Sequence, residues 1–206
     1  MTLKALLHKI PLALIYSRLL LGPVVLFLSF YDSILIRELI VGIMIWAIVS
    51  DIFDGIIARS LNISNEKLRR LDSSIDQIFW IFAFVGAFII SPQFFRDNLW
   101  KLSLVIALEA LTYAISYLRF KKEVATHAIL SKFWALTIVA TLIEVILRNG
   151  SGLIFNICFY LGVLSRIEII AILLILRKWT NDVPSVFHAI KLRKGEPIKR
   201  NKMFNG

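Results

Sequence analysis

Six long apolar stretches constrain the fold of this chain more than any other feature. Each is long enough for a transmembrane helix, which needs about 20 mostly apolar residues. The stretches lie near residues 10–30, 38–58, 73–91, 99–118, 128–147 and 152–176. Short polar or turn-forming segments separate them. The sequence therefore predicts an all-α integral membrane bundle of six transmembrane helices, formed by a single domain over residues 1–206.

The composition excludes an ordinary soluble domain. Hydrophobic residues make up 58% of the chain and charged residues 18%, whereas soluble domains are nearer about 45–50% and about 25%. The net charge of +10 would suggest nucleic-acid binding in a soluble protein. In a membrane protein it more simply marks the cytoplasmic loops, so we expect no nucleic-acid partner. The single cysteine, Cys158, cannot form an internal disulfide.

The basic residues predict the topology. With the N-terminus inside, seventeen Lys and Arg residues fall in cytoplasmic segments and four in outside loops. Since cytoplasmic loops carry the excess of Lys and Arg, both termini are expected in the cytoplasm. We expect the protein in the cell (inner) membrane.

Both ends of the chain suggest contact with the membrane surface. A short amphipathic surface helix is predicted at the N-terminus, where apolar residues recur at helical spacing beside Lys4 and Lys9; these are Leu3, Leu6, Leu7 and Ile10. The tail, at about 178–206, is basic. It either contacts anionic membrane lipids or is a solvated segment that only determines topology.

Two pairs of aspartates stand out near the ends of the second and third stretches. Asp51 and Asp54 are three residues apart, and Asp72 and Asp76 are four apart. Each pair therefore shares one face of a helix. Because the connection is short, we expect the two helices to be antiparallel neighbours. The four carboxylates would then meet at the cytoplasmic end of the bundle.

Four carboxylates in a poorly hydrated place repel one another unless they hold cations. Hard oxygen ligands of this kind suit Mg²⁺ or Mn²⁺ together with substrate phosphates. Two such ions can stabilise both sides of a phosphoryl displacement. The alternative is that these are ordinary helix-end residues, with Asp72 as a helix cap and the others paired with arginines, namely Arg59, Arg69 and Arg70.

The same residues resemble the CDP-alcohol phosphotransferase (CDP-alcohol phosphatidyltransferase) family. The run DIFDGIIAR, then eight residues, then LRRLDSSID is similar to the family pattern DxxDGxxAR, eight residues, GxxxDxxxD. The segment from Ile10-Pro11 through Arg18 to Pro23 looks like the usual first span, so the resemblance covers most of the chain. One position departs: Leu68 stands where the family has its second glycine.

The resemblance implies a reaction. Such enzymes cleave the pyrophosphate of a CDP-linked donor, usually CDP-diacylglycerol, release CMP, and join the lipid phosphate to an alcohol. It implies two metal ions held by the four aspartates, Asp51, Asp54, Asp72 and Asp76. Asp76 would also be the catalytic base. The donor nucleotide would lie against residues of the motif, namely Asp51, Gly55, Ala58, Arg59 and Leu68.

The alcohol acceptor is less well indicated. Lys132 resembles a basic position in members that use phosphorylated alcohols, and Arg119 and Lys122 are candidates beside it. Glycerol 3-phosphate is therefore the first choice, with inositol, inositol phosphate or serine, or another donor, as alternatives. A lysine reaching to the headgroups and topology alone explain these residues equally well. The family resemblance also implies a homodimer.

Other classes of membrane protein remain open. Membrane prenyltransferases also bind pyrophosphate through aspartates and Mg²⁺, but they usually have more spans and widely separated motifs. A cation transporter would place its carboxylates near the membrane midplane rather than at one end. An inactive homologue that only binds nucleotide is the third alternative, which Leu68 keeps open.

Overall fold

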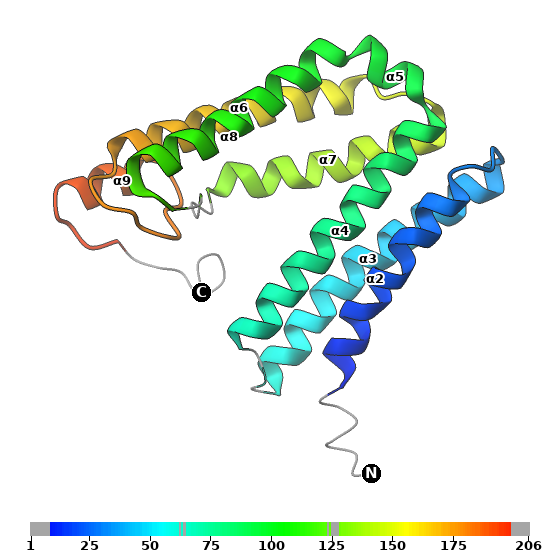
Figure 1. The fold of residues 1–206 in the computed structure, drawn as a ribbon, viewed down its shortest axis with the longest axis horizontal. Coiled ribbons are helices and arrows are strands. Elements are labelled where there is room, and N and C mark those ends of the chain that lie inside the picture. Colours follow the sequence, from blue (N-terminus) through cyan, green and yellow to red (C-terminus); the bar gives the residue numbers. More distant parts are fainter. Residues whose placement is uncertain (1–8, 62, 64, 123, 125–127, 199–206) are drawn as a thin grey trace. The chain divides into compact units, whose positions relative to one another are not determined.

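The structure is a computed structural model that describes residues 9–198, apart from 62, 64, 123 and 125–127. Its described part is all helical, as predicted. Six long helices follow one another along the chain: α2 (Ile10–Leu28), α3 (Ile34–Ser60), α4 (Glu66–Ile90), α6 (Leu99–Phe120), α7 (Ile129–Arg148) and α8 (Leu153–Ile175). Two short helices complete the set, α5 (Pro92–Asp97) and α9 (Val186–Arg193) (Figure 1).

The six long helices correspond to the six predicted spans. Each is long and apolar enough to cross a membrane, so the predicted class of fold is confirmed. The cytoplasmic location of the termini stays a prediction, as does the single domain. The predicted surface helix rests mainly on Leu3, Leu6 and Leu7, which lie outside the described residues, as does the end of the tail, 199–206.

The start of α4 differs from the prediction. The apolar stretch begins at residue 73, but the helix begins at Glu66 because Asn65 caps it: its side chain accepts a hydrogen bond of 2.9 Å from the backbone N–H of Leu68. Such a cap satisfies one of the donors left free in the first turn of a helix. Asp72 therefore lies inside α4, and the reading of Asp72 as its cap is wrong.

The chain divides into two compact units, and the first holds α2, α3, α4 and residues 142–150. Within it α2 packs against both α4 and α3. The approach of α2 to α4 is close, since a Cβ added at Gly22 would lie 2.7 Å from the ring of Phe82. The expectation that α3 and α4 are direct neighbours needs correction. They are not among the closely packed helix pairs of the described chain, so α2 is what joins them.

A buried arginine organises the other end of this unit. Arg37, at the start of α3, is 8% exposed and donates hydrogen bonds to the side chains of Asp32 (2.6 Å) and Asn149 (2.8 Å). It also donates to the carbonyl oxygen of Ile146 at 3.2 Å. Its charge is therefore compensated locally, as buried charges require.

The second unit is built mainly from α6, α8 and α9, with α8 packed against both of the others. Its buried apolar cluster lies at one end of α8 and consists of Ala128, Ile169, Ile172, Leu173, Leu176, Val183 and Ala189. Since Val183 and Ala189 belong to the predicted basic tail, this part of the tail is packed rather than solvated. Cys158 is buried and free.

Candidate metal and nucleotide site

The two aspartate pairs lie where the helices of the first unit share an end. Asp51 and Asp54 are in the last turns of α3, and Asp72 and Asp76 are near the start of α4. Because α3 runs antiparallel to both α2 and α4 (Figure 1), its C-terminal end meets their N-terminal ends. The helical spacing places both members of each pair on the face toward α2.

Arg18, in the middle of α2, contacts all four carboxylates. Its Nη1 atom donates to Asp51 at 3.1 Å and to Asp76. Its Nη2 atom donates to Asp72 at 2.7 Å and to Asp54. The arginine itself is completely buried. The prediction that the four carboxylates come together is confirmed, with Arg18 as their common partner.

The arrangement fits a divalent cation. One carboxylate oxygen each from Asp51, Asp72 and Asp76 lies within 4.8 Å of the others. This donor set is all oxygen and anionic, as Mg²⁺ and Mn²⁺ prefer. The fourth member, Asp54, is 3% exposed and lies outside this triad, although it shares the Nη2 atom of Arg18 with Asp72.

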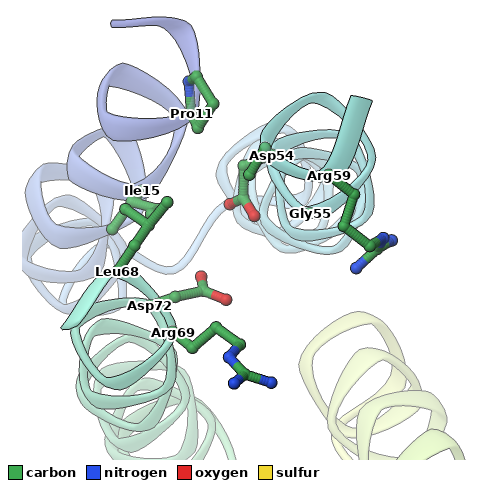
Figure 2. Close-up of a pocket in the computed structure, with 9 residues that line it drawn as sticks. Pro11, Ile15, Asp54, Gly55, Arg59, Leu68, Arg69 and Asp72 are labelled. Carbon is green, nitrogen blue, oxygen red and sulfur yellow. The ribbon is translucent and has the colours of Figure 1, made fainter. Parts of the chain in front are cut away.

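A cavity of about 130 Å³ opens beside the aspartates. Figure 2 shows the carboxylates of Asp54 and Asp72 pointing toward one another across it. The cavity is lined by residues of α2, α3 and α4: Pro11, Ile15, Asp54, Gly55, Ala58, Arg59, Leu68, Arg69 and Asp72. Four of the five predicted nucleotide residues are in this lining; Asp51, among the described residues, is not.

The lining has a basic part and an apolar part. A Cβ added at Gly55 would lie 3.2 Å from Nη1 of Arg59, so this guanidinium occupies the space that the missing side chain leaves. Arg69 brings a second guanidinium to the lining. Leu68 joins Pro11 and Ile15 as its apolar members. The cavity therefore combines anion-binding groups with a surface suited to a flat, apolar face of a ligand.

Sequence reasoning missed Arg18 and Arg69 as members of the site. A signal for Arg18 was present, because an arginine inside an apolar span usually has a functional partner. The signal for Arg69 required the start of α4. With α4 beginning at Glu66, Arg69 is three residues before Asp72 and shares its face.

The three candidate acceptor residues lie in the second unit. Arg119 donates to the carbonyl oxygens of Leu173 (2.8 Å) and Leu176 (3.2 Å), so it caps the C-terminal end of α8. Lys122 has its Nζ atom 4.5 Å from the ring centre of Trp179, a cation–π contact. Lys132 lies in the first turn of α7.

The second unit also holds a buried ion pair that the sequence suggested. Arg166 on α8 donates to Glu109 on α6. Its guanidinium lies 4.6 Å from the ring centre of Trp134. Opposite charges inside an apolar bundle are expected to pair in this way. The predicted Glu144–Arg148 pair is also present, at 3.3 Å.

Comparison with known proteins agrees with this site. The profile of the CDP-alcohol phosphatidyltransferase family matches residues 8–179, which include all of the residues described above. A relative from Aquifex aeolicus (strain VF5), named CDP-diacylglycerol–glycerol-3-phosphate 3-phosphatidyltransferase, is 24% identical over 173 residues. The match covers 84% of this chain and 93% of the relative. No solved structure matches the chain significantly.

The chain therefore belongs to the CDP-alcohol phosphatidyltransferase family, a family of transferases of phospholipid biosynthesis. Its six apolar helices indicate an integral membrane protein. Enzymes of this family generally use divalent metals, and the acidic triad supplies suitable ligands for one.

Proposed function

We propose that the protein transfers a phosphatidyl group from CDP-diacylglycerol to glycerol 3-phosphate and releases CMP. The observation that carries this proposal is the convergence of four aspartates, in register with the family motif, on one buried point beside a basic cavity. We place this site at the cytoplasmic face of the membrane. There a polar nucleotide reaches it from water while the acyl chains stay in the bilayer.

The four aspartates are proposed to hold one or two divalent ions. Asp51, Asp72 and Asp76 are the primary ligands, because their oxygens already lie within 4.8 Å of one another. Asp54 completes the set from the buried side. When bound, Mg²⁺ or Mn²⁺ supplies charge neutralisation for the pyrophosphate and for the departing CMP.

Residues of the cavity are proposed to bind the donor. Arg59 and Arg69 donate hydrogen bonds to pyrophosphate oxygens, for which the planar guanidinium is well suited. Gly55 and Ala58 leave room for the nucleotide against α3. Leu68 narrows the cavity on the α4 side, where other family members have a glycine, so the base is expected to lie against it.

Asp76 is proposed as the general base. Its carboxylate takes the proton from the acceptor hydroxyl, whose oxygen forms a bond to the phosphorus that carries the diacylglycerol. The bond from that phosphorus to the bridging oxygen breaks, and CMP leaves with the bridging oxygen. The partly exposed Asp76 side chain, 25% accessible, is open to such a hydroxyl.

Glycerol 3-phosphate is proposed as the acceptor because the relative from Aquifex aeolicus carries that substrate in its name and because Lys132 can bind a phosphate. Arg119 is the weaker candidate, since two carbonyl oxygens of α8 already occupy its guanidinium.

Release of CMP by the purified protein in detergent tests this proposal. The assay contains CDP-diacylglycerol, Mg²⁺ and one alcohol at a time: glycerol 3-phosphate, serine, inositol or inositol phosphate. Asp76→Asn is the negative control. Metal-dependent release with glycerol 3-phosphate alone supports the proposal. Release with another alcohol changes the acceptor, and no release from protein that binds Mg²⁺ points to another donor, an inactive homologue or a cation-binding role.

A further inference from the structure

The guanidinium of Arg18 joins the two aspartate pairs in a particular way. Nη1 contacts Asp51 of α3 and Asp76 of α4, whereas Nη2 contacts Asp54 of α3 and Asp72 of α4. Each terminal nitrogen therefore links one carboxylate of each helix. Since α3 and α4 are not closely packed against each other in the described chain, this fork is the direct polar connection between the pairs.

Arg18 is also incompletely satisfied. It is completely buried, yet its Nε atom has no hydrogen-bond partner among the described residues. A buried donor without a partner is unfavourable. The side chain is therefore placed to serve the carboxylates through its two terminal nitrogens rather than to satisfy its own donors.

The oxygens that Arg18 contacts belong to the carboxylates that would ligate a metal. It donates to the Oδ1 atoms of Asp51, Asp72 and Asp76, the three residues whose oxygens lie within 4.8 Å of one another. A guanidinium and a divalent cation at this place both need these carboxylates, and they repel each other. One positive charge among four negative ones leaves the group anionic, so a divalent ion is still attracted.

We propose that Arg18 is a positioning residue that acts as an internal counter-cation: it holds the four carboxylates together without metal and lowers the affinity of the site for divalent ions. This inference rests on the metal site of the proposed function, but not on the donor or the acceptor. A competing arginine keeps the metal from being trapped in a site of four carboxylates. Metal exchange during turnover then remains possible.

The proposal gives Arg18 two effects of opposite sign. Replacing it by a neutral side chain leaves the carboxylates uncompensated, which destabilises the metal-free protein. The same replacement removes both a repulsive charge and a competitor for the oxygens, which tightens metal binding. Because a ligand of the folded state stabilises it in proportion to its binding, the variant gains more stability from metal than the wild type. A merely structural arginine would lower stability without tightening metal binding.

The test compares four full-length proteins in detergent, without substrate, after metal removal with a chelator: wild type, Arg18→Gln, Arg18→Lys and Arg37→Gln. Mn²⁺ affinity is measured by electron paramagnetic resonance, and thermal unfolding is followed over a series of Mg²⁺ concentrations. Arg37→Gln is the matched control, because Arg37 is also a buried arginine of the first unit, paired with Asp32 and Asn149 instead.

We expect Arg18→Gln to bind Mn²⁺ about tenfold more tightly than the wild type, since a unit charge within contact distance is removed. It should unfold at a lower temperature in chelator and gain more from Mg²⁺. Arg18→Lys, whose single ammonium cannot span both pairs, should fall between the two. Arg37→Gln should lose stability but keep the wild-type Mn²⁺ affinity.

Unchanged or weaker Mn²⁺ binding by Arg18→Gln would overturn the proposal. If that variant does not fold, Arg18→Lys decides by the same measurement. No metal response from the wild type overturns this inference together with the metal site. A normal metal response without CMP release contradicts only the proposed reaction.

Discussion

The backbone N–H of Leu68 donates a 2.9 Å hydrogen bond to the side chain of Asn65, and this contact sets where α4 begins. It places Leu68 in the first turn, four residues before Asp72, so that both side chains face the same cavity. The residue that departs from the family pattern is therefore both part of a helix start and part of the candidate donor site.

Shortening Leu68 tests these two roles separately. Leu68→Ala keeps a good helix former and enlarges the cavity, so the KM for CDP-diacylglycerol should stay equal or fall. Leu68→Gly enlarges it further but costs about 0.5–1 kcal/mol of helix stability relative to alanine. Steady-state CMP release measures KM and kcat for both variants. A large rise in KM with Leu68→Ala would show instead that the leucine side chain contacts the donor and that this pocket differs from the family's.

Asp76→Asn should remove the proposed base while leaving the side chain its size. Loss of general base catalysis typically costs about 10²–10⁴-fold in rate, so CMP release should fall by at least about a hundredfold, with CDP-diacylglycerol still bound. Glu144→Gln is the control, because it is also a carboxylate in a helix of the first unit but pairs with Arg148. Activity near the wild-type level in Asp76→Asn would exclude Asp76 as the base.

Arg59→Gln should weaken donor binding more than catalysis. Arg59 lies in the last turn of α3 and lines the cavity, and a charge-assisted hydrogen bond contributes about 1.5–3 kcal/mol. Since Arg59 is exposed, we expect the lower end of this range, a rise of about tenfold in the KM for CDP-diacylglycerol. The exposed Arg148→Gln is the charge-matched control. An equal fall in kcat with KM unchanged would place Arg59 in transition-state stabilisation instead.

The sequence predicted the parts of this protein that depend on local pattern. Spans follow from runs of apolar residues, and the shared faces of the aspartate pairs follow from helical spacing. The role of Arg18 could not be predicted in the same way. Its partners lie 33 to 58 residues away, and only the packing of α2 against both α3 and α4 brings them within reach. Likewise, Arg119 carries a charge suited to an acceptor phosphate, but tertiary packing uses it to cap α8.

Arg119 and Lys132 should therefore behave differently when each is replaced by glutamine. Arg119→Gln leaves the carbonyl oxygens of Leu173 and Leu176 without their donor, so it should lower the unfolding temperature in detergent, with a loss of about 1 kcal/mol. The KM for glycerol 3-phosphate should change little.

Lys132→Gln should show the reverse pattern. Losing one ammonium from a phosphate site should raise the KM for glycerol 3-phosphate about tenfold, with little change in the unfolding temperature or in the KM for CDP-diacylglycerol. Lys101→Gln, which removes a lysine bound to Asn156, controls for loss of charge in the same unit. If Lys132→Gln leaves the KM for acceptor unchanged and Arg119→Gln raises it without loss of stability, the acceptor phosphate is bound by Arg119, and its contacts with α8 must open when substrate enters.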